Sequence, residues 1–382
     1  MSDKKNNDYL IDIASDSQYQ NQSDEYYKSY TRWRMNENNR FGYKFVKDKR
    51  EHTYAYGEGY EHKKASDAEK KALRSCASLT GGCLLVATLL RLMQEIFDSG
   101  TSQLMKDGTL ILTSGGHSMD ILNAFILLGA KLVMYLAAGI VFMMFIKLPR
   151  EVYFAKRTIK PAHVVYLLGI LNGIAMIWYL IFVFGSFVLP PDWLALPVAF
   201  FRSGSVWLDI LYIFLDYIVI SFIKAVFFNG LLTQSLRQFG DSTSIFLVSV
   251  LEGLMVMNIR AVGATFVLSM ITGLIILKTG SVIMGAAARI SVNLLFYLAE
   301  LINYSTGGRE SEIYLIIVEV LVIGFGLFCM GRLMARNDWD FNIDNVTTAL
   351  SFGEKVSVFF TAMPMISWTA AVIVMQLYVL LV

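Results

Sequence analysis

The chain has 382 residues, of which 55% are hydrophobic and only 17% are charged. A soluble domain of this length does not need so large an apolar fraction, so the composition excludes an ordinary soluble enzyme and indicates a membrane protein. The formal net charge is only +2, from 33 Lys and Arg against 31 Asp and Glu. Since binding to phosphates requires a basic excess, we expect no nucleic-acid partner.

The first 72 residues form a polar segment with few aliphatic side chains and nearly balanced charge. Such a segment cannot bury enough apolar surface to offset the entropy of ordering, so we predict a solvated, disordered tail over 1–72. A segment that docks on a partner is the alternative, because aromatic and basic side chains interleave there. These side chains are Tyr30, Trp33, Arg34, Phe41 and Tyr43.

From Cys76 to the C-terminus, apolar runs recur that are long enough to cross the ~30 Å hydrocarbon layer of a bilayer. The predicted helices cover 76–97, 121–147, 163–188, 208–236, 243–257, 262–278, 281–303, 313–335 and 355–381. We therefore predict an all-α fold, a polytopic membrane helical bundle of about nine transmembrane helices with a polar N-terminal tail. Eight or ten helices are the alternatives, and the transmembrane domain runs over 73–382.

The basic residues near the helix ends predict the orientation of the bundle in its membrane. Lys and Arg gather before the first helix, in the loop 148–160 and after later even-numbered helices. The alternate loops, such as 98–120, contain few of them. Because basic loops remain on the cytoplasmic side, we predict a cytoplasmic N-terminus and a C-terminus outside.

The stretch KAVFFNGLLTQSLRQFG, residues 224–240, resembles the signature helix of the CPBP family. This family comprises the CAAX proteases and the bacteriocin-processing membrane proteins, and its segment has a Glu-Glu pair, an apolar spacer and then Phe-Arg-Gly. Gly230 fits that pattern. Lys224 and Ala225 stand where the two glutamates belong, and Asn229 stands where the arginine belongs. The segment therefore keeps the scaffold of the family motif and loses its reactive side chains.

Two further segments resemble the family in the expected order and spacing. LEGLMVM resembles a Phe-Gly-x-x-His helix, with Glu252 at the aromatic position, Gly253 kept and Val256 at the histidine position. KTGSVIMGAAARISVN resembles the segment that runs from Thr-Gly-Ser to His-x-x-x-Asn. There Arg289 stands at the histidine position and Asn293 is kept. We take residues 208–305 as a CPBP-like core.

The resemblance implies an intramembrane endopeptidase scaffold, in which glutamate and histidine side chains activate water. All four histidines of this chain lie at or before position 163, outside the core. We therefore expect a non-proteolytic pseudoprotease, without metal or cofactor, in a bacterial cell membrane. It would act as a scaffold or regulator that binds a membrane or cell-envelope protein or peptide. The alternatives are an active endopeptidase that uses Glu252 as its base, and a transporter or channel.

Three charged side chains fall on core helices that the resemblance brings together, namely Lys224, Glu252 and Arg289. An unpaired charge at bilayer depth costs at least ~2.5–3.5 kcal/mol, so we expect these charges to neutralise one another. In this prediction Glu252 contacts Arg289 and also Lys224, while Asn229 and Asn293 complete the hydrogen bonding. The alternative is that the long side chain of Lys224 reaches a membrane interface.

Overall fold

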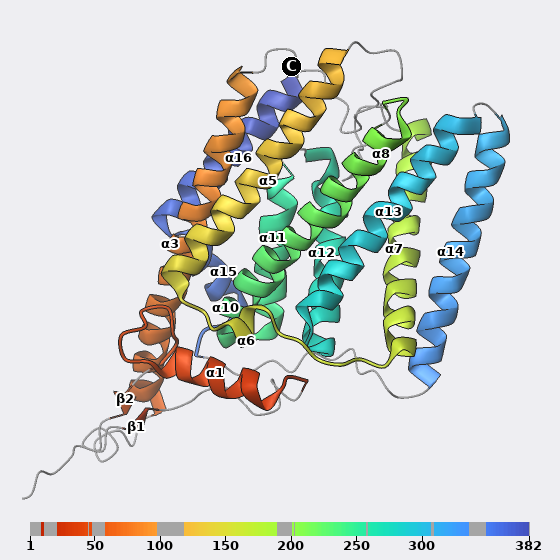
Figure 1. Cartoon of the computed structure of the whole chain (residues 1–382). Coiled ribbons are helices and arrows are strands. Elements are labelled where there is room, and N and C mark those ends of the chain that lie inside the picture. The colour runs from red at the N-terminus through yellow and green to blue at the C-terminus, as the bar shows by residue number, and fades with distance from the viewer. Residues whose placement is uncertain are drawn as a thin grey trace, which may run out of the picture.

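The computed structural model describes residues 9–10, 21–44, 46–47, 58–97, 118–188, 201, 203–256, 259–306, 309–335 and 349–381. Long helices lie side by side in a bundle, with the short helix α1 across one end of it (Figure 1). Two strands of two residues each, β1 (Tyr9–Leu10) and β2 (Val46–Lys47), form one antiparallel pair. The predicted all-α polytopic bundle is confirmed.

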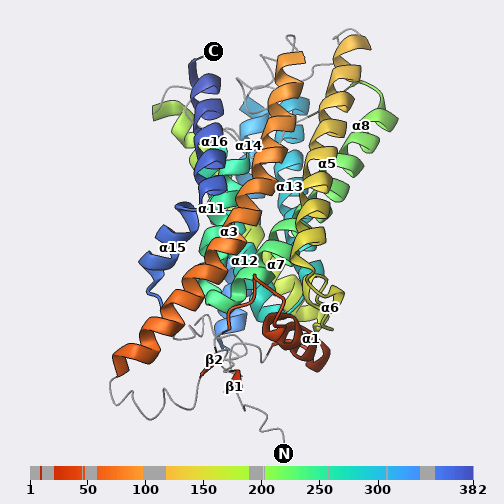
Figure 2. The same cartoon turned by 90° about the vertical axis from the view of Figure 1, so that its left-hand side faces the viewer.

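The helices of the bundle follow the apolar ranges of the sequence. They are α3 (Glu58–Phe97), α5 (Ser118–Ile146), α7 (Pro161–Val188), α11 (Asp241–Met255), α12 (Ile259–Thr279), α13 (Val282–Thr306), α14 (Arg309–Ala335), α15 (Phe352–Phe360) and α16 (Met363–Leu381), together with a compound helix over 206–239. The short helix α6 (Arg150–Tyr153) lies in the loop between α5 and α7. Helix α1 lies at one end of the bundle and α16 ends at the opposite end (Figure 2).

The number of membrane spans is smaller than the predicted nine. Within the described residues, seven helices are long and apolar enough to cross a membrane, or eight if α15 and α16 together make one span. Helix α11 has only 15 residues, which at ~1.5 Å per residue falls short of a ~30 Å hydrocarbon layer. The last predicted span is broken, because α15 and α16 are bent by 78° relative to each other.

The compound helix over 206–239 carries the signature segment and changes its winding along its length. Its parts are α8 (Val206–Ile213), η2 (Phe214–Ile220), α9 (Ser221–Lys224), η3 (Ala225–Leu232), α10 (Thr233–Leu236) and η4 (Arg237–Phe239). The parts η2 and η3 are π-helical. The π-helix is rare, and its wider turns frequently occur at functional sites. The two π-helical stretches flank the short α-helical segment that contains Lys224.

The prediction of a solvated tail is wrong for residues 21–44. Helix α1 (Asp24–Met35) and the turn after it pack against the bundle, and the five interleaved residues of the tail are all buried. The Trp33 indole donates to the carbonyl of Ile146 at 2.9 Å, and the Tyr26 hydroxyl donates to Gln234 at 2.6 Å. Burial raises the pKa of Tyr26, which keeps this hydroxyl protonated as a donor. Contacts with distant chain segments order residues whose local composition is polar.

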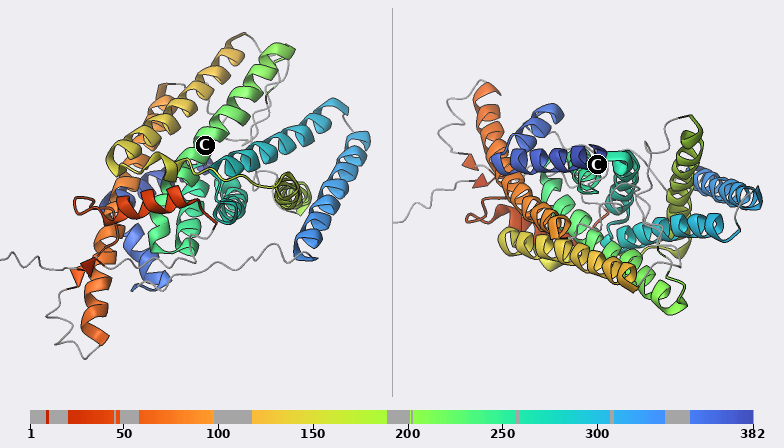
Figure 3. Two further views of the ribbon diagram at one scale, coloured as in Figure 1. Left: turned by 60° about the horizontal axis from the view of Figure 1, so that its bottom comes forward. Right: turned by 90° about the horizontal axis from the view of Figure 1, so that it is seen from above.

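Close helix packing positions the core of the bundle around the compound helix. A Cβ atom on Gly230 would collide with the carbonyl oxygen of Tyr153, and one on Gly253 would lie 3.2 Å from the carbonyl oxygen of Val262. Small residues at such points let two backbones approach closely. The compound helix contributes Phe227 to one apolar cluster and Tyr217 to a second cluster, which α7, α12, α13 and α14 share. It therefore lies between the two apolar clusters. Figure 3 shows the green ribbon of this helix between α5 and α13.

Candidate functional site

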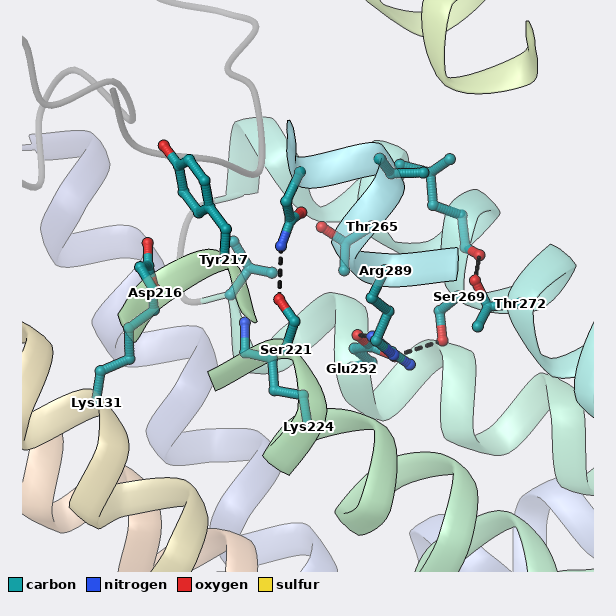
Figure 4. Close-up of a pocket in the computed structure, with 14 residues that line it drawn as sticks. Lys131, Asp216, Tyr217, Ser221, Lys224, Glu252, Thr265, Ser269, Thr272 and Arg289 are labelled. Carbon is teal, nitrogen blue, oxygen red and sulfur yellow. Dashed lines mark hydrogen bonds and ion pairs between the residues drawn. The ribbon is translucent and has the colours of Figure 1, made fainter. Parts of the chain in front are cut away.

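An ion pair between Glu252 of α11 and Arg289 of α13 lies at the centre of the core segment (Figure 4). The Glu252 Oε1 contacts the Arg289 Nη1, and the Arg289 Nη2 donates to Oε2 at 2.6 Å. The Ser269 hydroxyl of α12 donates to the same Oε2 at 2.6 Å. Both carboxylate oxygens therefore accept hydrogen bonds, in the bidentate geometry that makes Arg–carboxylate pairs strong.

Asn229 of η3 holds the other edge of the guanidinium group. Its Oδ1 accepts from the Arg289 Nε at 3.1 Å and from Nη2 at 2.7 Å. The Asn229 side chain is buried, and its Nδ2 has no hydrogen-bond partner within the described residues. Because the amide oxygen must face the guanidinium, the amide nitrogen is left unpaired at a free-energy cost. Asn229 stands where the family has an arginine. In this chain it accepts hydrogen bonds from Arg289, an arginine of another helix.

Lys224 lies apart from this ion pair. Within the described residues it forms no ion pair, and its ammonium lies 4.9 Å from the centre of the Tyr135 ring of α5. Figure 4 shows its side chain directed toward the hydroxyl of Ser221 rather than toward Glu252. The cation thus contacts the face of an aromatic ring, a favourable placement for a partly desolvated ammonium. The expected contact between Lys224 and Glu252 is not made.

The remaining sequence-derived positions take different places. Val256 and Asn293 line a cavity, whereas Ala225 is buried in η3. The Asn293 Nδ2 donates to the Ser221 hydroxyl at 2.8 Å, so it joins α13 to α9 instead of completing the hydrogen bonds of the ion pair.

The cavity lies between α5, the compound helix, α11, α12 and α13, and has a volume of about 80 Å³. On its far side from Glu252, Lys131 of α5 pairs with Asp216 of η2 at 2.7 Å (Figure 4). The cavity is therefore lined at two places by an acid and a base in contact, with Lys224 between them. A space of this size with polar walls holds a few water molecules or a small polar group.

Sequence reasoning missed Lys131, Asp216, Ser221 and Ser269 as residues of this site. A signal for two of them was available, because a charged residue inside an apolar helix marks a functional position by default. Lys131 and Asp216 both lie inside long apolar ranges. Serines carry no such signal, since they are ordinary residues of membrane helices that face one another.

Comparisons with known proteins bear on this segment alone. Residues 205–295 match the family model Rce1-like, described as type II CAAX prenyl endopeptidase Rce1-like. No curated protein and no solved structure matches the chain. The resemblance inferred from the three motifs is thereby confirmed, and the matched segment contains every residue of the Glu252–Arg289 ion pair and its partners. Residues 205–295 are thus similar to the Rce1-like members of the CPBP family, and the helices around them are long and apolar enough for an integral membrane protein.

The chemistry open to this arrangement is limited by the pairing of its charges. A general base needs a carboxylate or imidazole that can accept a proton from water. The carboxylates that line the cavity are Glu252 and Asp216, and each is held by a cation. Within the described residues, no group of three or more His, Cys, Asp and Glu side chains is placed to hold a metal ion. Both carboxylates of the cavity are therefore engaged with cations.

Proposed function

We propose that this protein is a non-proteolytic member of its family, a pseudoprotease that binds a membrane or cell-envelope protein or peptide and acts by holding it. The observation that supports the proposal is the closed Glu252–Arg289 ion pair. To serve as a base, Glu252 would first have to release both Arg289 and Ser269. Release would leave a guanidinium and a carboxylate unpaired away from water, and breaking such a buried pair costs ~3–5 kcal/mol.

The substitutions along the signature segment support the same proposal. Lys224 carries a positive charge where the family uses a glutamate, and Val256 offers no titratable group where the family uses a histidine. Asn229 and Arg289 have become partners of one another across two helices. Two of the replaced positions, Asn229 and Arg289, thus form a structural network with Glu252, which is what selection for a scaffold rather than for catalysis would maintain.

A proteolysis assay tests the catalytic half of the proposal. Purified protein in lipid vesicles is incubated with membrane-anchored and prenylated peptides, beside an active CPBP-type endopeptidase as the positive control. We expect no turnover above that of empty vesicles. Turnover that disappears in Glu252→Gln but persists in Glu300→Gln would establish the active endopeptidase instead. Glu300 is a suitable control because it is a carboxylate of α13 that contacts Tyr179 and does not line the cavity.

A co-purification experiment tests the binding half. The protein is isolated in mild detergent and its stoichiometric partners are identified by mass spectrometry. Val256→Phe enlarges a side chain in the cavity wall and keeps both residues of the ion pair, and Leu321→Phe adds the same ring at an exposed position of α14. We expect a membrane or cell-envelope protein to be lost with Val256→Phe and retained with Leu321→Phe. A wild-type protein that purifies alone would contradict the scaffold role.

Ion flux in proteoliposomes tests the transporter or channel. The charged residues inside the bundle give a reason for this test, since such residues mark ion paths in some membrane proteins. We expect no flux, because the cations and carboxylates of the two ion pairs neutralise one another. Flux that is altered by Asp216→Asn would contradict the proposal.

A further inference from the structure

A second concave surface lies away from the cavity, between α3 and α5 on the outside of the bundle. It has a volume of about 860 Å³ and runs along α3 from Asp67 to Val86. Figures 1 and 2 both show the upper part of α3 beside α5, and Figure 2 shows the lower part of α3 diverging from it. The groove is therefore a long, open channel on a membrane-spanning part of the protein rather than an enclosed site.

The two ends of this groove differ in chemistry. One end carries a cluster of cations, Arg40, Lys70, Lys71 and Arg74, beside a single carboxylate, Asp67. Further along α3 the lining is mainly apolar and includes Leu79 and Val86, and α5 contributes Val141 and Phe145 to the groove. The groove is thus complementary to an amphiphilic ligand, because one part of it carries a net positive charge and the rest is lined by apolar side chains.

The cations remain available to a ligand. Among the described residues, Lys70, Lys71 and Arg74 form no ion pair within the bundle. Lys71 and Arg74 are exposed, and Lys70 is partly exposed. Each Lys or Arg near an anionic membrane surface contributes about 1 kcal/mol of attraction. Three such side chains on adjacent turns of α3 give a preference for a lipid with a negative head group.

The apolar end has room for a hydrocarbon chain. A Cβ atom built on Gly82 would have no atom within 4 Å, so the floor of the groove is open at this position. From Arg74 to Val86 the helix rises by ~18 Å, at ~1.5 Å per residue. This length is close to half of the ~30 Å hydrocarbon layer. One acyl chain of one leaflet therefore matches the groove when its head group lies at the cations.

We propose that this groove binds a phospholipid with an anionic head group, its phosphate at Lys70, Lys71 and Arg74 and one acyl chain over Gly82. A zwitterionic phospholipid with the same chains would fill the apolar end without satisfying the cations. A free glycerol phosphate would satisfy the cations without filling the apolar end. The site needs both parts of the ligand, and the proposal does not depend on whether the protein cleaves peptides.

Native mass spectrometry of the purified protein in nonionic detergent tests the proposal. The probes are palmitoyl-oleoyl phosphatidylglycerol, phosphatidylcholine with the same chains, and glycerol 3-phosphate. We expect the phosphatidylglycerol to bind at least tenfold more tightly than the phosphatidylcholine, and the glycerol phosphate not to bind. Equal binding of the two phospholipids, or binding of glycerol phosphate alone, would overturn the proposal.

Two sets of variants separate the groove from general attraction to a basic surface. Gly82→Leu fills the apolar floor and keeps every charge, so we expect phosphatidylglycerol binding to fall at least tenfold. Its control is Gly331→Leu on α14, where an added side chain also meets nothing within 4 Å, and there we expect a change of less than twofold. Phosphatidylglycerol binding to Gly82→Leu within twofold of wild type would refute the groove.

The charge variant keeps the test decisive if the glycine variant fails to fold. This triple variant combines Lys70→Gln, Lys71→Gln and Arg74→Gln. All three side chains are exposed or partly exposed, so their replacement leaves the packed core unchanged. We expect this triple variant to bind phosphatidylglycerol no more tightly than phosphatidylcholine, with the melting temperature within a few degrees of wild type. A preference for phosphatidylglycerol that persists at the wild-type ratio would overturn the assignment of the head group.

Discussion

The two ion pairs of the cavity differ in how completely they are enclosed. The Glu252–Arg289 pair has side chains that are only 7% and 10% exposed, and Asn229 and Ser269 complete its hydrogen bonds. The second pair joins Asp216, 5% exposed, to Lys131, whose side chain is 34% exposed. One carboxylate therefore accepts hydrogen bonds at both oxygens, and the other is bound by a cation whose side chain is a third exposed.

This difference indicates that the two sides of the cavity serve different purposes. A polar network in which both charged groups are hydrogen-bonded fixes one arrangement of helices, since its members lose partners if the arrangement changes. A pair with one member that is a third exposed, and with fewer hydrogen bonds to its carboxylate, holds its cation less firmly. The Glu252 side therefore holds α11, α12, α13 and η3 together. The Asp216 side is the one at which a bound group can compete for the charges.

The largest expected effect is the loss of stability when the enclosed pair is broken. Glu252→Gln leaves the Arg289 guanidinium without its counter-charge, so we expect a loss of ~3–5 kcal/mol. Adding Arg289→Met should recover part of this loss, because both charges are then gone. Thermal unfolding of the protein in nanodiscs measures each step, with Glu300→Gln as the control carboxylate. If the double change costs as much as the sum of the single ones, the two side chains do not interact.

A smaller effect is expected when only the support of the enclosed pair is removed. Asn229→Ala deletes two hydrogen bonds to a charged group, and a hydrogen bond of this type contributes ~1.5–3 kcal/mol. It also removes the unpaired Nδ2, so the measured loss should lie near the low end of that range. The matched control is Asn172→Ala, since Asn172 accepts only from the neutral hydroxyl of Ser291, at 3.2 Å. An equal loss in both variants would mean that the guanidinium does not need Asn229.

Breaking the exposed pair should destabilise the protein least. Lys131→Met removes a side chain that is a third exposed, and the Lys224 ammonium lines the same cavity as Asp216. We expect a smaller loss than that of Glu252→Gln, because the Lys224 ammonium can take over as the counter-charge of Asp216. The same unfolding series in nanodiscs provides the comparison. A loss as large as that of Glu252→Gln would show that the two pairs are equivalent and would contradict the assignment of different purposes.

The orientation of the bundle in the membrane decides which membrane face lies nearer to Asp216. The cysteine substitutions that test this orientation should have the smallest effect on stability. Asp216 lies closer to the Val206 end of the compound helix than to its other end. In a background without Cys76, Cys83 and Cys329, Ser102→Cys should react with an impermeant thiol reagent on intact cells. Thr158→Cys should react only after permeabilisation. The reverse pattern would place the N-terminus outside. Ser102 itself lies outside the described residues.

Local sequence patterns were sufficient for the positions of the helices. Each of the nine predicted apolar ranges overlaps helix in the described part of the chain, because hydrocarbon requires every backbone group to bond within its own segment. The same patterns overestimated the number of spans. The predicted range 243–257 already had the 15 residues of α11 and was too short to cross a membrane, and the hydropathy of 355–381 does not reveal the bend before α16. The motifs were sufficient for locating the core, which the family match over 205–295 confirms.

The sequence by itself determined that this protein is an apolar helical bundle with a CPBP-like core and replaced reactive residues. Those properties follow from hydropathy and short spacings, which each segment carries alone. Only the tertiary structure decided that Lys131 pairs with Asp216 and that Lys224 contacts Tyr135 instead of Glu252. It also decided that α1 is bound to the bundle, because the Tyr26 hydroxyl bonds Gln234 across 208 residues of chain. These contacts between distant residues depend on how the helices pack and on the wider turns of η2 and η3. A local sequence pattern predicts neither.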